Sequence, residues 1–418
     1  MKENKSNILM FSVFTILFFT VMIAIASQAD AKRPIIKHYG IVDLTGPYGI
    51  LVPDLWEGKL DYYRFINEEG GIEGHPIKLI WGETGNMMAR TWSHYKRYKR
   101  ANVQLLWLAS SPDGEALKKI LKRDKVLCPL NYGQSDPQLY PPAWIYIDGP
   151  SYGEGFGAFL RMAKAKWDKS GKKGTMKVGI IGPDTAYGRA AIEPGKRFGK
   201  KIGVDVVGQE YAPVVPIDLT PQILRLKDKG VDWIWCQGLS QIATVFLKNM
   251  SSLGLKGKIP VAGFWWVTGA EMLRRIGPKF SEGYIFLTYN YLPQVEKNHP
   301  GIKNCIKMRQ KYHRKDPDEY YVRGVRATQF VIELTKRTIK KYGFKGLTAS
   351  NYMRTMETFK DWKTPWDLGA PFTITPNDRR TAKKMLFYQV RGGKIYRYSD
   401  WINAPHLYPE NMSHLFKK

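Results

Sequence analysis

From residue 35 to residue 289, short apolar runs rich in β-branched residues alternate with stretches whose apolar residues recur at helical spacing. Residues 35–44, 103–109 and 177–181 are typical of buried strands. The stretch after Pro53 is typical of an amphipathic helix that ends at a pair of glycines. Because such alternation is typical of parallel sheets covered by helices, the pattern predicts an α/β fold.

The alternation runs through two similar series, which predicts two doubly wound parallel-sheet lobes. After residue 289 the pattern is mostly helical, and Gly392-Gly393 marks a closing hairpin. We expect a hinge of several crossing strands near Asp148, Tyr289 and residues 362–366. The expected organisation is lobe 1 at 32–148, lobe 2 at 149–282, a return to lobe 1 at 283–361, and the hinge with a C-terminal hairpin of lobe 2 at 362–418.

The first 31 residues have the features of a signal peptide. Lys2 and Lys5 precede an apolar stretch at residues 8–26, and Ala29-Asp30-Ala31 has the small-x-small pattern of a cleavage site. We therefore expect export to the periplasm and a mature chain that begins near Lys32. The apolar stretch is nearly long enough to span a bilayer, so an uncleaved N-terminal membrane anchor remains an alternative.

Composition narrows the classes of function. A chain of 418 residues, 44% hydrophobic, is too long for one compact core. The net charge of +28 is typical of nucleic-acid-binding proteins, but an exported protein rarely encounters nucleic acid. The basic run at residues 95–100 has the spacing of one solvated helix face. The charge also fits attraction to anionic lipid or acidic solutes. Cys128, Cys236 and Cys305 lack metal or redox spacing, and Cys128 and Cys236, which lie in apolar strand-like runs, are expected to be buried free thiols.

Motifs typical of enzymes are missing from the sequence. There is no His-Glu-x-x-His, no Gly-x-Ser-x-Gly and no phosphate-binding loop that ends in Lys-Ser or Lys-Thr. The glycine-rich run at residues 153–158 places Glu154 where a pyrophosphate would lie, so we interpret it as the start of a helix. We expect neither catalysis nor a cofactor or metal.

Three segments carry a resemblance to a known family: LTGPY at residues 44–48, INEEGGI at 66–72 and GPDTAYG at 182–188. In order and spacing they are similar to the type I periplasmic solute-binding proteins of the branched-chain amino acid and amide class, which feed ATP-driven importers. The resemblance implies a monomer that captures a small amino acid-like, amide or organic-acid ligand between its lobes and delivers it to an ABC permease complex. A periplasmic sensor that presents the same solute to a membrane receptor is the alternative.

Ligands of doubly wound sheets bind beyond the carboxyl ends of the strands, where loops lead into helix N-termini. Ser110 and Ser111 occupy such a loop after the strand at 103–109, although Ser111 could instead cap the helix. The resemblance implies ligand contacts for these serines and for Tyr187. The candidates of lobe 1 are Tyr48, Ser110, Ser111, Asn131, Tyr132 and Ser135, and those of lobe 2 are Ser151, Tyr152, Tyr187, Gln237, Ser240, Trp265 and Trp266.

The sequence departs from the amino acid binders at two places. Those proteins commonly hold the ligand ammonium with acidic residues where this chain has Ser151 and Trp265. A buried ammonium without a carboxylate costs several kcal/mol. Asp148 or Glu154 could substitute if the alignment shifts. Our hypothesis is that the ligand is a small carboxylate or amide, stacked on Trp265 or Trp266, rather than an α-amino acid.

Overall fold

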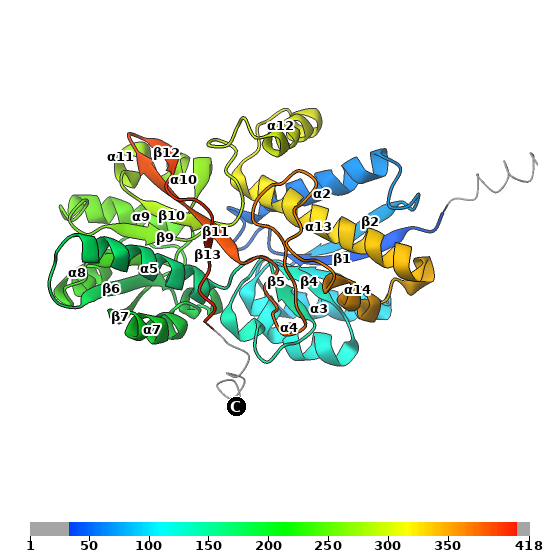
Figure 1. Cartoon of the computed structure of the whole chain (residues 1–418), viewed down its shortest axis with the longest axis horizontal. Coiled ribbons are helices and arrows are strands. Elements are labelled where there is room, and N and C mark those ends of the chain that lie inside the picture. The colour runs from blue at the N-terminus through cyan, green and yellow to red at the C-terminus, as the bar shows by residue number, and fades with distance from the viewer. Residues whose placement is uncertain (1–32, 408–418) are drawn as a thin grey trace, which may run out of the picture.

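The computed structural model describes residues 33–407, and it consists of two lobes side by side, each built on its own sheet (Figure 1). The expected signal peptide at residues 1–31 and the last residues, 408–418, lie outside the described residues. Within the described part of the chain, no helix has both the length and the apolarity to cross a membrane.

The first sheet is entirely parallel, with the strand order β2-β1-β3-β4-β5. Its strands are β1 (Ile36–Val42), β2 (Ile77–Glu83), β3 (Leu106–Leu108), β4 (Cys128–Asn131) and β5 (Ile145–Ile147).

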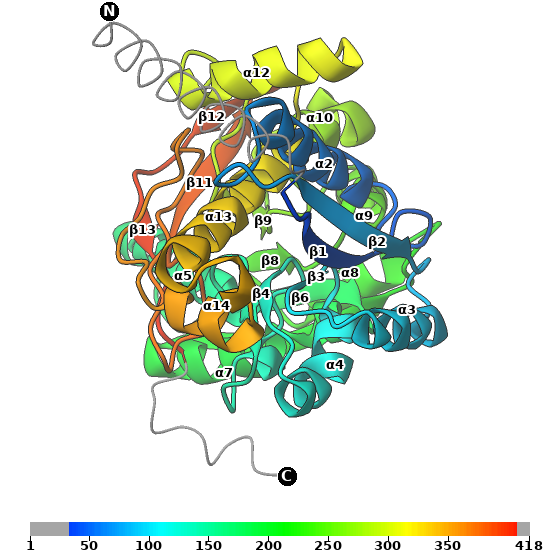
Figure 2. The same cartoon turned by 90° about the vertical axis from the view of Figure 1, so that its right-hand side faces the viewer.

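Helices cover both faces of this sheet (Figure 2). On β1, Tyr39 and Ile41 belong to the core cluster of α3 (Met88–Arg100) and α4 (Ser111–Asp124). Gly40, between them, faces the opposite side of the sheet, where the Trp56 ring of α2 (Val52–Glu68) packs against it. Because successive strand residues face opposite sides, a short apolar run can fill two cores at once.

The second sheet is mixed, with the strand order β12-β11-β10-β9-β8-β6-β7 and β13 paired to β11. Its parallel strands are β6 (Met176–Pro183), β7 (Val204–Ala212), β8 (Trp233–Cys236), β9 (Val261–Gly263) and β10 (Ile285–Thr288). Its antiparallel strands are β11 (Lys384–Arg391), β12 (Lys394–Arg397) and β13 (Ile402–Asn403). The expected hairpin at Gly392-Gly393 therefore extends the second sheet.

Successive residues of β8 also face opposite sides of the sheet. Trp233 and Trp235 contact the phenylalanines of α5 (Tyr152–Lys169), while Ile234 and Cys236 join the opposite core. The α5 face also carries α7 (Ile192–Lys201), and the short α6 (Ala186–Arg189) follows β6. The opposite core contains α8 (Thr220–Asp228), α9 (Ser240–Ser252), α10 (Gly269–Ile276) and α11 (Pro278–Ser281).

The chain then returns to the first lobe. The helices α12 (Pro300–His313), α13 (Glu319–Tyr342) and α14 (Ala349–Met356) follow β10, and α13 packs along α2. We expected the return at residue 283, but β10 pairs with β9 and β11, so the chain leaves the second lobe only after Thr288.

Three crossings connect the lobes. The segments after β5 and β10 are bridged to a third segment, through Ile147 with Arg380 and Asn290 with Gly369. Asp148 and Tyr289 lie at the expected crossings. The third crossing follows residues 362–366 rather than coinciding with them, because Trp362 pairs locally with Phe372.

Two local predictions are confirmed. Residues 153–158 lie in the first turns of α5, where Ser151 and Glu154 form a capping box. Cys128 and Cys236 are buried and free, and so is Cys305. The Thr220-Pro221 pair also predicts a helix with its N-cap at Thr220, but the N-cap of α8 is Leu219, and the Thr220 backbone N–H donates to the Asp218 carboxylate.

Candidate functional site

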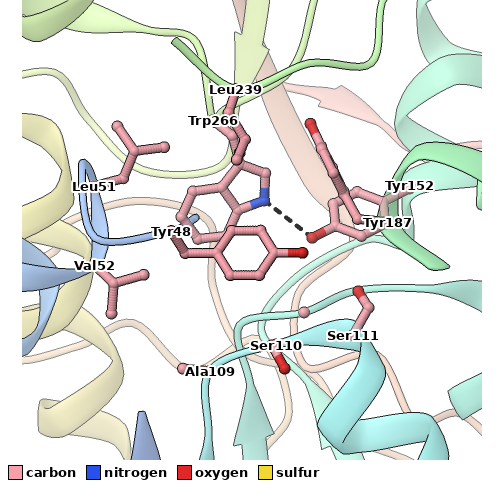
Figure 3. A pocket seen from close by; sticks show the side chains of 11 residues that line it. Tyr48, Leu51, Val52, Ala109, Ser110, Ser111, Tyr152, Tyr187, Leu239 and Trp266 are labelled. Atoms are coloured by element: carbon pink, nitrogen blue, oxygen red, sulfur yellow. Dashed lines mark hydrogen bonds between the residues drawn. The ribbon is translucent and has the colours of Figure 1, made fainter. Parts of the chain in front are cut away.

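A small cavity, with about 20 Å³ of room for the centre of a water-sized group, lies where loops of the two lobes face each other (Figure 3). Each loop follows the carboxyl end of a parallel strand, the position that sequence reasoning favoured. We call the loops of the first lobe the first rim and those of the second lobe the second rim. The first rim contributes Tyr48, Leu51, Val52, Ala109, Ser110, Ser111 and Gly133, and the second rim contributes Tyr152, Tyr187, Leu239 and Trp266.

The two serines of the first rim have different roles. Ser110 is the N-cap of α4, because its hydroxyl accepts from the Asp113 backbone N–H at 3.2 Å and donates to the Asp113 carboxylate at 2.7 Å. The buried Ser111 hydroxyl makes no hydrogen bond of standard geometry among the described residues, although the Tyr152 hydroxyl lies close enough to interact with it. In Figure 3 this hydroxyl points toward Tyr152, whereas that of Ser110 points away. The capping role that we considered for Ser111 therefore belongs to Ser110.

The close approach of two loops positions Ser111. A Cβ on Gly133 would lie 2.0 Å from the Ser111 backbone nitrogen, so only glycine fits there. Asn131 fixes the same junction, because its amide nitrogen donates to the Ser110 carbonyl at 3.0 Å. These two contacts hold the loop so that the Ser111 hydroxyl lies at the cavity.

Aromatic side chains make up most of the second rim. Trp266 donates its indole N–H to the Tyr152 hydroxyl at 3.0 Å, and Tyr187 donates to the Gly238 carbonyl at 2.8 Å. Burial raises the pKa of the Tyr152 and Tyr187 hydroxyls, which keeps both neutral. The two rims also touch directly, since the Gln241 amide donates to the Pro47 carbonyl at 3.3 Å. The structure therefore represents a closed arrangement of the lobes.

No carboxylate lines the cavity. Asp148 is buried in an ion pair with Arg326 at 3.0 Å, and Glu154 in one with Arg380 at 2.6 Å. Neither is free to hold an ammonium group. Asp113 lies behind Ser110 at the N-terminus of α4, where burial raises the pKa of its carboxyl group.

Several predicted residues lie next to the cavity rather than on its surface. Asn131 and Ser135 hydrogen-bond to Gln138, and Ser151 caps α5 and donates to Asp136. Gln237 joins Trp235 to the Tyr187 carbonyl. Their polar atoms form hydrogen bonds with neighbouring protein groups, because the polar groups of a buried loop have no water to bind.

The remaining predicted residues outside the cavity are aromatic or lie at a helix start. Tyr132 is buried and stacks on Trp107, and Trp265 stacks behind Tyr152 with ring centroids 5.7 Å apart. Ser240 begins α9, and its buried hydroxyl has no partner among the described residues. Of the two tryptophans, only Trp266 offers a ring to the cavity.

Sequence reasoning missed the apolar and small lining residues, which are Leu51, Val52, Ala109, Gly133 and Leu239. Each directly adjoins or lies close to a residue that was selected, so strand-end position was the available signal. Our search favoured polar and aromatic side chains and therefore passed over them.

Among the described residues, no group of three or more His, Cys, Asp or Glu is arranged to hold a metal ion. A family model described as "Periplasmic binding protein" matches residues 40–394.

The chain belongs to the periplasmic binding protein family. Proteins of this family bind solutes and are not enzymes, as we expected of this chain. Its fold is similar to that of a branched-chain amino acid ABC transporter protein from Thermus thermophilus with bound valine, with a TM-score of 0.81, 18% identity, and coverage of 90% of this chain and 98% of the other. The predicted two-lobed α/β fold is thereby confirmed.

Two further relatives illustrate the range of the family. A fatty acid ABC transporter substrate-binding protein from Thermomonospora curvata superposes with a TM-score of 0.77 at 21% identity, over 90% of this chain and 93% of the other. A Leu/Ile/Val-binding protein homolog of Brucella abortus is 18% identical over 379 residues, covering 89% of this chain and 93% of the relative. The ligands named for these relatives differ, so the family alone does not identify a solute.

Proposed function

We propose that this protein is the periplasmic solute-binding component of an ABC importer. Family membership, the ABC transporter names of its relatives and a cavity between two facing rims support this role. The expected signal peptide fits export to the periplasm. The sensor alternative has no comparable support among the relatives.

The proposed ligand is a small, largely apolar solute that ends in a carboxylate or an amide. The single observation that carries this proposal is the buried Ser111 hydroxyl, which makes no hydrogen bond of standard geometry, in a cavity that no carboxylate of the described residues lines. The hydroxyl can donate to a ligand oxygen, and Leu51, Val52 and Trp266 can enclose an apolar or planar body. An α-amino acid would place its ammonium among these groups without an anionic partner, at a cost of several kcal/mol.

Binding is proposed to proceed by closure. The solute first contacts one rim, and the lobes then rotate about the three crossings until the rims enclose it. The contact between Gln241 and Pro47 forms only when the rims meet. A permease can therefore recognise the loaded protein by its closed shape.

A thermal-shift screen of the mature chain, followed by calorimetry, tests the ligand class. The panel contains benzoate, phenylacetate and 4-methylpentanoate, their amides, and leucine, isoleucine and valine. We expect acids or amides to bind and the three amino acids not to bind. Nanomolar to micromolar leucine binding would refute the ligand class while leaving the solute-binding role intact. Loss of uptake of the identified solute after gene deletion tests the importer role.

A further inference from the structure

The guanidinium group of Arg323 lies directly behind the second rim. Arg323 belongs to α13 of the first lobe and is fully buried. Its Cζ atom is 4.8 Å from the centroid of the Trp266 ring, and its Nη2 donates to the Trp265 carbonyl at 3.2 Å. A positive group of one lobe therefore contacts the tryptophan that lines the cavity from the other lobe.

This charge has no ion-pair partner among the described residues, and the Nη1 atom of Arg323 has no hydrogen-bond partner there either. The neighbouring Arg326, in contrast, is neutralised by Asp148 at 3.0 Å. Glu319, one helical turn from Arg323, accepts from the Thr268 hydroxyl at 3.4 Å and from its own backbone N–H, and it forms no ion pair with Arg323. Burial raises the pKa of Glu319 well above its usual range, which favours the uncharged carboxyl.

Besides the ion-paired Arg326, a second buried base, Lys59, adds little positive charge to this region. Lys59 lies under Trp107 on the first-lobe side, and burial lowers the pKa of its amine well below the usual range. Asp113 is separated from Arg323 by the cavity, because it lies behind Ser110 of the first rim. The charge balance around the second rim is therefore positive.

Such a charge is costly to bury. A desolvated cation without a carboxylate is strongly unfavourable, and stacking on aromatic rings offsets only part of the cost. Arg323 lies over the rings of Trp266, Tyr289 and Tyr320 at 4.8, 5.0 and 5.7 Å. An anionic ligand on the other side of Trp266 would supply the missing negative charge.

We propose that Arg323 determines specificity by making the closed cavity prefer a carboxylate over its neutral amide. This inference rests on the proposed solute-binding function and adds a charge preference to it. The effect depends on closure, because Arg323 and Trp266 belong to different lobes and meet only when the rims face each other. Arg323 acts through space and contacts the wall of the cavity rather than the ligand.

The test compares one acid with its amide. Calorimetry measures 4-methylpentanoate and 4-methylpentanamide binding to the wild type and to Arg323→Met, Arg323→Lys and Arg337→Met. In Arg323→Met we expect acid affinity to fall about tenfold or more and amide affinity to change less than about threefold, because the removed charge attracts the carboxylate through the poorly screening interior but acts little on a neutral amide. Arg323→Lys retains the charge and should keep most of the acid preference.

Arg337→Met is the matched control, because Arg337 is a cation of the same helix that pairs with Glu333 far from Trp266. It should leave the ratio of acid to amide affinity unchanged. Equal losses for both probes in Arg323→Met would overturn the inference and assign Arg323 a structural role. Should Arg323→Met not fold, Arg323→Gln provides the same comparison. A wild type that binds the amide as tightly as the acid also refutes the inference, whereas a wild type that binds no member of the panel refutes the proposed function itself.

Discussion

The two rims of the cavity differ in chemistry although both are strand-end loops of parallel sheets. In the first rim, Ser110 caps the start of α4 and Gly133 lets a second loop approach Ser111 closely. The rim presents the Ser111 hydroxyl to the cavity. The second rim is an aromatic surface in which Tyr152 and Trp266 hydrogen-bond to each other. Equivalent positions in the fold therefore support different tasks, since the first rim can orient a polar end and the second can enclose an apolar body.

The interiors of the lobes differ in the same way. The first lobe buries His38, which hydrogen-bonds to the Tyr63 hydroxyl, and Lys59, whose amine has no hydrogen-bond partner among the described residues. The second lobe fills the corresponding layer with Phe156, Trp233 and Trp235. We therefore expect the stability of the first lobe to depend on pH through these buried bases.

The largest expected effect is on the first rim. Gly133→Ala should abolish measurable ligand binding in calorimetry, because the added Cβ would lie 2.0 Å from the Ser111 nitrogen and must displace the loop. Gly254→Ala is the control: Gly254 has φ +63 and open space around it, so it should lose only about 1–2 kcal/mol of stability from strain. Unchanged affinity in Gly133→Ala would show that the first rim does not position the ligand.

The next effect concerns pH and the first lobe. Burial, assisted by Lys59, lowers the pKa of His38 to about 3, so the unfolded chain takes up a proton that the folded chain rejects as pH falls below 6.5. Stability attributable to His38 is therefore complete above pH 6.5 and decreases toward pH 3, by up to about 1.4 kcal/mol per pH unit.

Urea unfolding at a series of pH values checks this expectation. His38→Gln should show a shallower loss of stability on acidification than the wild type. His75→Gln is the control, because His75 lies at the surface against Phe344. Identical slopes for the wild type and His38→Gln would contradict the contrast between the lobe interiors.

A smaller effect is expected for ligand affinity when Ser111, but not Ser110, is replaced. Ser111→Ala should weaken binding of a carboxylate ligand about tenfold, because a hydrogen bond to a charged group contributes on the order of 1.5–3 kcal/mol. The melting temperature of the unliganded protein should not fall, since the hydroxyl that is removed makes no hydrogen bond of standard geometry among the described residues. An unaltered affinity would remove Ser111 from the proposed site.

The smallest effect is on Ser110. Ser110→Ala should lower the free energy of unfolding by about 1 kcal/mol through loss of the cap of α4. Affinity should change less than about threefold, because the hydroxyl is occupied by Asp113. Chemical unfolding and calorimetry of both serine variants give the comparison. Reversed outcomes, with Ser110 governing affinity and Ser111 governing stability, would invert our assignment of the two serines.

Much of the fold was predictable because periodicity and end signals are local. The strands predicted at residues 35–44 and 177–181 correspond to β1 (Ile36–Val42) and β6 (Met176–Pro183). The early end predicted for lobe 2 was an error of a different kind, since β10 is identified with the second sheet only by its pairing with β9 and β11. Pairing between distant segments leaves little trace in a local pattern.

The candidate site was predictable in location but less so in detail. Strand ends indicated the loops of Tyr48, Ser111, Tyr152 and Trp266, which the structure brings to one cavity. No local signal distinguished Trp266, which lines the cavity, from Trp265, which packs behind Tyr152. The choice depends on which ring fits the core, and packing is a property of all the neighbours together.

By itself, the sequence determined the alternation of strands and helices, the two series that build the lobes, and the loops from which a binding site could be made. These features follow from the periodicity of each element and the chemistry of its ends, which act over a few residues. Only the tertiary structure decided which serine presents its hydroxyl to the cavity, where Asp148 and Glu154 place their charges, and that Arg323 of one lobe lies behind Trp266 of the other. Those outcomes depend on contacts between segments far apart in the chain, which form only when the lobes fold and meet.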